Sequence, residues 1–460
     1  MSKILDKFLA DAEKKSFDPE HRRRLDFNIG KYDSKVIDGK KQFSDLELAR
    51  RRAAMRKHKV ISNLDKYLLE FETNFEKRGG KVIWAPSEKD AQKEILSIIK
   101  KANAHLIVKQ KTMLSEELEI NEFLQKHKRE VVETDLGEFI VQVAGEKPYH
   151  ILTPAMHKSK EDVAELFHEK FGTPLQSTPA DIAHFVREQL RMKFIRADVG
   201  ITGGNFLVAD AGALVLTENE GNGLLCYAFP KIHIALVGIE KIIPSLDDLD
   251  LFLPLLATYG TGQLITAYNN LIFGPKTADE PDGPEEMYVI LIDNRRTEVL
   301  RHTEQRQALA CIRCGACLNA CPIYRSIGGY SYGAVYSGPI GSIISPHYLG
   351  LKDYNHLSYA CSLCGKCTEV CSVHIPLHEL LLYNRNETVQ KGFVKSSWKF
   401  MMKGWKRVML RRWMLDKTGA GMKNRIFRMY FKKWWGPRRE LPKFAEKNFK
   451  QLWLENHQDN

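Results

Sequence analysis

The sequence lacks any apolar run long enough to cross a membrane. Its longest apolar stretches, such as Leu251 to Leu256, are far shorter than the about 20 residues that a spanning helix needs. The first residues, MSKILDKFLADAEKK, carry charges every few positions and contain no apolar core of a secretory signal. We therefore expect a cytoplasmic protein whose contact with a membrane, if it has one, is peripheral and on the inner face.

Two cofactor signatures that are common in dehydrogenases are also absent. No G-x-G-x-x-G opens a strand–helix unit, which argues against a bound NAD, and no flavin signature is recognisable. The nearest glycine signal is GITGG at residues 200–204. It is typical of tight turns, and an anion-binding loop is the alternative.

Cysteine is scarce outside two short segments. Cys226 stands alone in GLLCYAFP, and such a cysteine is typically a small buried side chain. The other eight form two groups with the same C-x2-C-x2-C-x3-C spacing, namely Cys311, Cys314, Cys317 and Cys321, then Cys361, Cys364, Cys367 and Cys371. Grouped cysteines are unusual in disulfide frameworks and indicate metal ligands in a reducing compartment.

The spacing predicts two [4Fe–4S] clusters that exchange one ligand. Three thiolates at three-residue spacing can bind three irons of a cuboidal cluster, and the fourth ligates the other cluster in two-cluster ferredoxins. We assign one cluster to Cys311, Cys314, Cys317 and Cys371, and the other to Cys361, Cys364, Cys367 and Cys321. Zinc is the alternative, but a tetrahedral zinc site does not call for a third cysteine at this spacing in both groups.

The segment between the two groups, residues 323–360, is longer than the linker of small β-type ferredoxins. It resembles the helical ferredoxin module of the succinate dehydrogenase iron–sulfur subunit. We therefore expect an α-helical two-cluster ferredoxin domain over residues 301–390 that transfers electrons.

From about residue 76 to residue 300, short apolar runs alternate with amphipathic stretches. The expected strands are residues 81–85, 105–109, 130–134, 150–153, 232–237 and 288–292, with helices at 88–102 and 115–126. A glycine-rich segment, 197–223, adds short strands with turns at Gly203-Gly204 and Ala211-Gly212. Alternating strands and helices predict an α/β domain with a largely parallel sheet.

The two ends of the chain are charged in different ways. Residues 1–75 are predicted to form an N-terminal helical segment. Its helix from Leu46 past Val60 carries a basic run at Arg50-Arg51-Arg52, Arg56, Lys57 and Lys59. This run indicates a solvated helix face, and an anion-binding face is the alternative.

Residues 391–460 form a basic, Trp-rich C-terminal tail. Within 391–440 there are sixteen Lys and Arg against two acids, so the chain's net charge of +12 belongs to this segment. Such a tail can lie on an anionic membrane surface or dock on an acidic partner subunit. Nucleic acid is not expected, because no recognition motif supports it.

Five segments are distinctive in combination: KTMLSEELEIN (111–121), VVETDLGEFIVQVAGEKPYHILTPAMH (131–157), ADVGITGGNFLVADAGALVL (197–216), DGPEE (282–286) and CIRCGACLNACPIYRSIGG (311–329). With them the chain resembles the lactate utilization protein B family. The resemblance runs from about residue 47 to 382. It implies an α/β LUD domain over 76–300, similar in fold to ribose-5-phosphate isomerase and CoA transferases, followed by the ferredoxin domain.

The resemblance also implies a role in oxidising L-lactate to pyruvate with two partners, a cysteine-rich subunit and a second LUD-domain protein. Oxidation of a 2-hydroxy acid removes two electrons and two protons, and iron–sulfur clusters cannot accept a hydride. We therefore expect an electron-transfer subunit rather than a complete catalyst. The alternatives are a subunit of another hydroxy-acid or quinone-linked dehydrogenase, and a redox- or metabolite-sensing regulator.

Polar residues near the ends of the expected strands are candidates for substrate contact, because open α/β sheets bind ligands there. They are Lys111, Glu133, Asp135, His150, His157, Asp198, Thr202 and Asp210. A carboxylate substrate would favour Lys111, or Arg196 beside Asp198. For each candidate the alternative is an ordinary strand-end or helix-capping residue, and both histidines could pack against the sheet.

Overall fold

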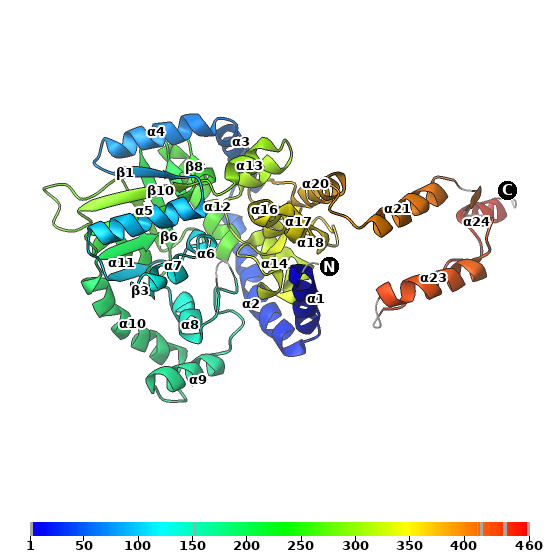
Figure 1. The fold of residues 1–460 in the computed structure, drawn as a ribbon, viewed down its shortest axis with the longest axis horizontal. Coiled ribbons are helices and arrows are strands. Elements are labelled where there is room, and N and C mark those ends of the chain that lie inside the picture. Colours follow the sequence, from blue (N-terminus) through cyan, green and yellow to red (C-terminus); the bar gives the residue numbers. More distant parts are fainter. Residues whose placement is uncertain (1–2, 151–152, 412, 415–416, 436–438, 458–460) are drawn as a thin grey trace. The chain divides into compact units, whose positions relative to one another are not determined.

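A computed structural model describes residues 3–150, 153–411, 413–414, 417–435 and 439–457. Met1–Glu387 form one compact unit and Thr388–Asn460 form a second. The first unit contains the sheets and both cysteine groups (Figure 1). No helix among the described residues is both long enough and apolar enough to span a bilayer.

Six parallel strands form the main sheet, in the order β1-β10-β7-β4-β2-β3. They are β1 (Lys81–Ala85), β10 (Glu286–Ile292), β7 (Ile232–Gly238), β4 (Val199–Thr202), β2 (Leu106–Lys109) and β3 (Glu130–Glu133). Strands β4 and β7 are buried along their whole length, as expected for a parallel sheet covered on both faces. The predicted α/β domain with a largely parallel sheet is confirmed.

Helices cover both faces of this sheet (Figure 1). On one face, α5 (Glu88–Lys101), α6 (Met113–Glu117) and α7 (Ile120–Lys126) bury apolar side chains against the strands. On the other face, α8 (Leu136–Ala144), α9 (Lys160–Phe171), α10 (Pro179–Arg196) and α11 (Asn222–Ala228) enclose a second core. The start of α10 follows from its sequence, since Thr178 and Asp181 form a capping box around Pro179.

A second sheet has four strands in the order β8-β5-β6-β9. Side chains of this sheet, of the main sheet and of α4 (Leu64–Glu76) form the third apolar core of the unit. The strands of the second sheet are β8 (Ile242–Ile243), β5 (Phe206–Val208), β6 (Ala213–Glu218) and β9 (Tyr268–Ile272). The predicted turn at Ala211-Gly212 joins β5 to β6. Gly212 has φ of +55°, and a Cβ there would approach backbone atoms of Asn74 and Phe75 to 2.5 Å, so a larger residue does not fit.

Other predicted elements agree with the structure within a residue or two, with two exceptions. The expected helix 115–126 is divided into α6 and α7, because Glu119 adopts a left-handed conformation with φ of +46°. The expected strand 150–153 is not tested, because residues 151 and 152 lie outside the described residues.

Residues 301–390 are helical and contain no strand, and every one of them is described. After α13 (Arg296–Arg301) and the 3-10 helix η4 (Gln305–Ala310), the chain forms several short helices and two longer ones. They are α14 (Ala316–Ala320), α15 (Pro322–Ile327), α16 (Gly338–Leu349), α17 (Leu351–Tyr354), α18 (His356–Tyr359), α19 (Lys366–Glu369) and α20 (Leu377–Gln390). This confirms the expected α-helical ferredoxin-type region.

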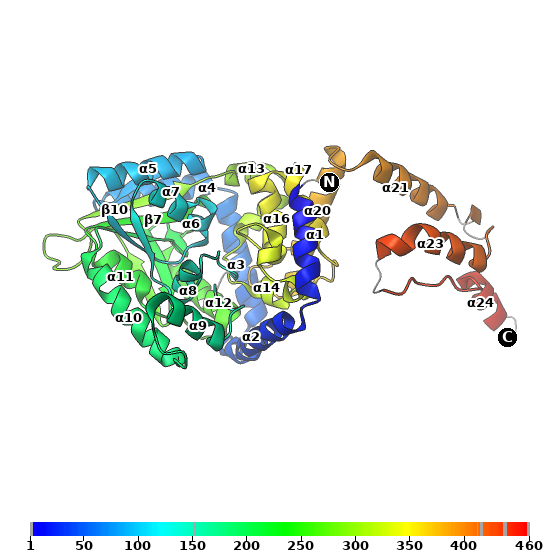
Figure 2. The same cartoon turned by 60° about the horizontal axis from the view of Figure 1, so that its bottom comes forward.

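The first two helices, α1 (Lys3–Ser16) and α2 (Pro19–Gly39), pack against this helical region (Figure 2). The ring of Phe8 lies 5.0 Å from that of His356 and 6.4 Å from that of Tyr332. Arg325 of α15 forms an ion pair with Asp33 of α2. The N-terminal helices therefore complete the core around the cysteines.

Helix α3 (Leu46–Ile61) agrees only in part with the solvated face expected from its basic run. Arg51, Arg52, Arg56 and Lys59 are exposed, whereas Arg50 is half-buried and Lys57 is buried. Arg50 donates a hydrogen bond to the carbonyl oxygen of Cys371 at 2.8 Å. Lys57 is 1% exposed and donates to the carbonyl oxygen of Glu240 at 2.6 Å. One side of the run is buried because the cysteine region and the sheet both cover it.

The second unit contains α21 (Ser396–Met409), α23 (Ala420–Trp435) and α24 (Phe449–Asn456). No residue of α21 is buried. Its exposed apolar side chains Trp398, Met402, Trp405 and Met409 follow helical spacing, so they share one face of the helix.

A buried ion cluster in the first unit joins helix α13, helix α6 and the residues that follow β7. Arg296 is 1% exposed, and its Nε lies 2.7 Å from Oε2 of Glu240. Its Nη1 and Nη2 lie 2.9 and 2.8 Å from the two carboxylate oxygens of Glu117, which makes a bidentate pair.

Replacing Arg296 by Leu is expected to lower the free energy of unfolding by about 3–5 kcal/mol, because two buried carboxylates lose their counterion. Urea unfolding of the purified chain measures the loss. Arg301→Leu, which changes an exposed arginine at the end of the same helix α13, is the matched control and should change stability little. Equal stability of the two variants would contradict a structural role for the ion cluster.

Candidate functional site

The two cysteine loops follow the same backbone path. Arg313 and Gly315 in the first loop have φ of +62° and +81°, and Leu363 and Gly365 in the second have φ of +56° and +80°. These left-handed residues turn backbone N–H groups toward sulfur. The N–H of Arg313 donates to Sγ of Cys311 at 3.4 Å, and that of Leu363 donates to Sγ of Cys361 at 3.3 Å.

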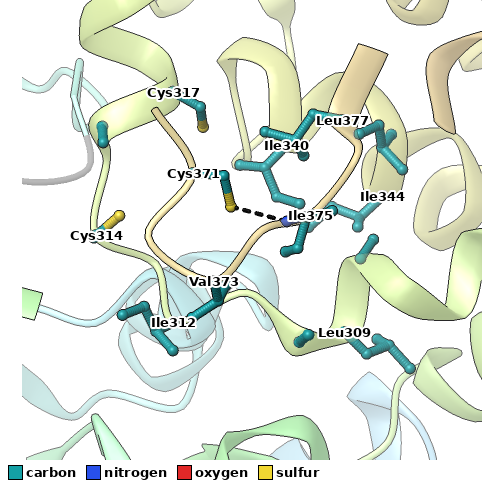
Figure 3. Close-up of a cluster of buried hydrophobic side chains, with 14 of the residues drawn as sticks. Leu309, Ile312, Cys314, Cys317, Ile340, Ile344, Cys371, Val373, Ile375 and Leu377 are labelled. Atoms are coloured by element: carbon teal, nitrogen blue, oxygen red, sulfur yellow. Dashed lines mark hydrogen bonds between the residues drawn. The ribbon is translucent and has the colours of Figure 1, made fainter. Parts of the chain in front are cut away.

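The fourth cysteine of each group also receives a backbone hydrogen bond. Sγ of Cys321 accepts from the N–H of Tyr324 at 3.5 Å, and Sγ of Cys371 accepts from the N–H of Ile375 at 3.3 Å (Figure 3). Such donors stabilise thiolates bound to iron.

The residue after the fourth cysteine differs between the two groups. Pro322 starts α15 in the first group, whereas Ser372 occupies this place in the second. Ser372 is 1% exposed, and its hydroxyl oxygen lies 3.5 Å from Sγ of Cys314. The departure from proline therefore places a polar group beside a cysteine of the other motif.

The sulfur atoms form two sets, and each set draws on both motifs. Burial, followed by the neighbouring Cys314, raises the pKa of Cys371 to about 12, and Cys311 adds to this rise. Figure 3 shows the side chain of Cys371 near those of Cys314 and Cys317.

In the other set, burial, followed by the neighbouring Cys361 and Cys321, raises the pKa of Cys367 to about 12, with Cys364 adding to it. The partners within the two sets are the same as in the assignment made from the spacing. Thiols grouped in fours with backbone N–H donors fit the ligand requirement of a [4Fe–4S] cluster.

The two sets differ in exposure. Cys314, Cys317 and Cys371 are buried and Cys311 is half-buried, whereas Cys364 of the other set is exposed. The set containing Cys364 is therefore the one nearer the surface of this unit.

Several cations lie near Cys311. Burial, followed by the neighbouring Lys241, lowers the pKa of Lys57 to about 7. Burial, followed by Arg313, lowers the pKa of Lys241 to about 8. Arg313 lies 3.4 Å from Glu240 through Nη2, and its guanidinium stands 4.6 Å from the ring centre of Tyr336.

A cavity of about 310 Å³ lies between the carboxyl ends of the parallel strands and the first cysteine loop. Its wall includes residues that follow β2, β4 and β7, part of helix α12 (Leu249–Thr261), and Arg313, Cys314 and Tyr336 of the cysteine region. Gly203 and Gly204 of the GITGG segment belong to this wall. The segment is thus a turn after β4 that also forms part of the cavity wall.

Two of the predicted site residues lie together in this cavity. Lys111 and Asp135 both line it, and Lys111 Nζ lies 3.9 Å from Asp135 Oδ2. Asp135 also caps α8 by accepting a hydrogen bond from the N–H of Glu138 at 3.0 Å.

The remaining candidates lie outside the cavity wall and have structural contacts. Glu133 pairs with Lys109 Nζ at 2.7 Å, and Thr202 Oγ1 lies 2.8 Å from His233 Nε2. Asp198 accepts the N–H groups of His105 and Leu106, and Asp210 accepts that of Leu246.

Arg196 and Asp198, the other pair expected to favour a carboxylate, do not line this cavity. Arg196 is exposed at the end of α10. Asp198 precedes β4, so it lies at the opposite edge of the parallel sheet from the residues that follow the strands.

Both candidate histidines pack against aromatic rings. His157 stacks on Tyr149 at 4.8 Å, and its Nε2 lies 2.7 Å from Glu146. His150 lies edge-on to Tyr324 at 5.8 Å, and burial lowers its pKa to about 3. Cys226 is fully buried, as predicted, with its sulfur 3.5 Å from the hydroxyl of Thr134.

Sequence reasoning did not single out Glu218, Lys241 and Arg313, which line the cavity. Glu240 and Lys241 follow the expected strand 232–237, so the strand-end rule used for the other candidates could have found them. Arg313 lies inside the first cysteine motif, whose spacing indicates a role only for the cysteines.

Comparison with known proteins agrees with this arrangement. Residues 68–292 match the LUD domain family, and residues 307–375 match the 4Fe-4S dicluster domain family. A DUF162 family protein from Deinococcus radiodurans has 14% sequence identity and a TM-score of 0.29, over 50% of this chain and 98% of that one.

Curated relatives match most of the chain. Lactate utilization protein B of Bacillus cytotoxicus is 46% identical over 337 residues, which cover 73% of this chain and 71% of the relative. Lactate utilization protein B of Bacillus thuringiensis is 45% identical over 350 residues, covering 76% and 73%. The uncharacterized electron transport protein YkgF of Escherichia coli is 43% identical over 364 residues, covering 79% and 76%. By its two domains and by this identity over most of its length, the chain belongs to the lactate utilization protein B family.

Proposed function

We propose that this chain is an iron–sulfur electron-transfer subunit of a complex that oxidises L-lactate to pyruvate. The observation that carries the proposal is the gathering of eight cysteines into two sulfur sets that each draw on both motifs. The names of the relatives, lactate utilization protein B and electron transport protein, support it. When bound, [4Fe–4S] clusters supply one-electron transfer.

The proposal assigns two clusters to this chain. Cys311, Cys314, Cys317 and Cys371 would hold the first, and Cys361, Cys364, Cys367 and Cys321 would hold the second. The hydrogen bonds from Arg313, Leu363, Tyr324 and Ile375 to sulfur would stabilise the ligating thiolates. The exposure of Cys364 makes the second set the natural point of contact for an electron-transfer partner.

The proposal places the hydride step outside this chain. Its proposed partners are a cysteine-rich subunit and a second LUD-domain protein. A subunit of another hydroxy-acid or quinone-linked dehydrogenase would use the same cysteines, and growth tests separate it from the lactate role. A redox sensor is disfavoured because five of the eight cysteines are buried, whereas a sensor needs an accessible, labile cluster.

The crossed ligand sets can be tested in a chain that retains one cluster. With Cys361, Cys364 and Cys367 changed to Ala, anaerobically purified protein should keep about four irons. Adding Cys371→Ala should then reduce the iron content and produce the electron paramagnetic resonance signal of a three-iron species. Adding Cys321→Ala to the same background is the control and should leave the four-iron signal. The opposite pattern would show that each motif ligates its own cluster.

The role in lactate oxidation can be tested in cells and with purified protein. A strain without the chain should lose growth on L-lactate as sole carbon source and keep growth on others. The intact chain should restore growth, and a Cys317→Ala chain should not. The purified chain with both clusters and no flavin should not reduce a dye with L-lactate, because it cannot take a hydride. Turnover by the purified chain alone would overturn the role as a subunit.

We also propose that the basic tail attaches the chain to an anionic surface, either a membrane or an acidic partner. The exposed apolar stripe of α21 with intervening lysines supports this. The full chain should float with anionic vesicles or co-purify with its partner subunits, and removal of residues 391–460 should abolish whichever occurs. High salt should weaken the attachment. An unchanged attachment after truncation would exclude the tail.

A further inference from the structure

The cavity beside the first cysteine loop has the position of a ligand site. Its wall contains Lys111, the Gly203-Gly204 turn and Gly238, which follow or end the parallel strands β2, β4 and β7. Open α/β sheets bind ligands outside these carboxyl ends. The opposite wall contains Cys314, so a molecule in the cavity would lie next to a proposed ligand of the first cluster.

The cations in this wall differ in the number of ion pairs and hydrogen bonds that they form. The guanidinium of Arg296 is fully paired, because Glu117 and Glu240 both form ion pairs with it. Lys241, in contrast, forms no hydrogen bond or ion pair with any side chain in the part of the chain that the structure describes. Lys241 is half-buried, and only the neighbouring Glu240 and Cys311 act in favour of its charge, so its ammonium can still donate hydrogen bonds to a bound anion.

Arg313 gives a second, independent indication. Its side chain is 9% exposed, and only Nη2 reaches Glu240, at 3.4 Å. Its Nη1 is buried without a hydrogen-bond partner among the described residues. A guanidinium that presents an unused donor beside an unpaired ammonium matches the planar, two-oxygen geometry of a carboxylate.

The other part of the wall carries acidic and neutral polar side chains instead of cations. It contains Asn205, Thr217 and the carboxylates of Asp135, Glu218 and Glu220. Glu218 already accepts the N–H groups of Gly223 and Leu224, at 2.6 and 2.8 Å. Carboxylate oxygens at this end can accept a hydrogen bond from a hydroxyl group, the amide of Asn205 and the hydroxyl of Thr217 can donate one to a carbonyl, and the carboxylates repel a second carboxylate. The volume of about 310 Å³ is at the lower end for small-molecule sites.

We infer that this cavity binds a small monocarboxylate with an adjacent hydroxyl or carbonyl group, a 2-hydroxy or 2-oxo acid, through Lys241 and Arg313. The inference rests on the proposed function for the choice among carboxylates and goes beyond it by giving this chain a substrate-binding site of its own. Lys241 and Arg313 hold the carboxylate, and the polar end of the cavity receives the neighbouring oxygen.

Calorimetric titration of the full-length, cluster-loaded chain under anaerobic conditions tests the site. The probes are L-lactate, pyruvate, acetate and inorganic phosphate. L-lactate or pyruvate should bind saturably and more tightly than acetate, which lacks the adjacent oxygen. Binding of phosphate alone, or of no probe, would overturn the inference.

Lys241→Met keeps the length of the side chain and removes its charge. It should weaken binding at least tenfold while iron content stays unchanged. Lys231→Met, an exposed lysine paired at 3.6 Å with Glu285, is the matched control and should bind as the unchanged chain does. Equal binding by both variants would contradict the role of Lys241.

A spectroscopic measurement locates the bound molecule. Adding the tighter-binding probe should change the electron paramagnetic resonance spectrum of the reduced chain that keeps only the first cluster, and should not change that of a chain keeping only the second. If both spectra remain unchanged despite binding, the molecule binds elsewhere and the inference fails.

The outcomes for the site and for the proposed function are distinguishable. If the strain without the chain cannot grow on lactate but the cavity binds no carboxylate, the electron-transfer role stands and the site falls. If the cavity binds lactate but the strain grows on it normally, the site stands and the role in lactate oxidation falls.

Discussion

The arrangement of the whole first unit depends on the neutralisation of one buried guanidinium. Arg296 joins Glu117 of α6 to Glu240 after β7, and Glu240 continues to Arg313 in the first cysteine loop. Tyr336, from the segment between the cysteine groups, bonds to the same Glu117 at 2.5 Å. Each ion has lost its hydration, so each must keep its partner at bonding distance. This requirement holds the sheet, the cavity and the cysteine loop in a single geometry.

Much of the fold could be predicted from the sequence because it is determined locally. Strands such as β7 are continuous apolar runs, and α10 has its capping box and proline at the start. Strand β9 was not expected, because YNNLI is half polar and becomes a strand only by pairing with β6. The break between α6 and α7 at Glu119 could not be predicted, because no glycine or proline marks it in the sequence.

The cysteine spacing predicted the sulfur sets because the cluster chemistry itself dictates that spacing. The cavity could not be predicted in the same way. Its cations, Lys241 and Arg313, are 72 residues apart in the sequence numbering and meet only through tertiary structure. The basic run of α3 shows the same limit, since its charges indicated a solvated face whereas the sheet buries Lys57. Local patterns identify which residues are charged, and only the packing decides which charges remain unpaired.

The packing of α1 on the helices around the cysteines has a consequence for how the protein is made. Phe8 leaves the ribosome well before its neighbour Tyr332, which follows only after more than three hundred further residues. At about 5–20 residues per second, the apolar side of α1 waits for roughly 15–65 s. Helix α1 therefore reaches its native place only after the cysteine region has been synthesised, and until then its apolar side lacks the residues that cover it.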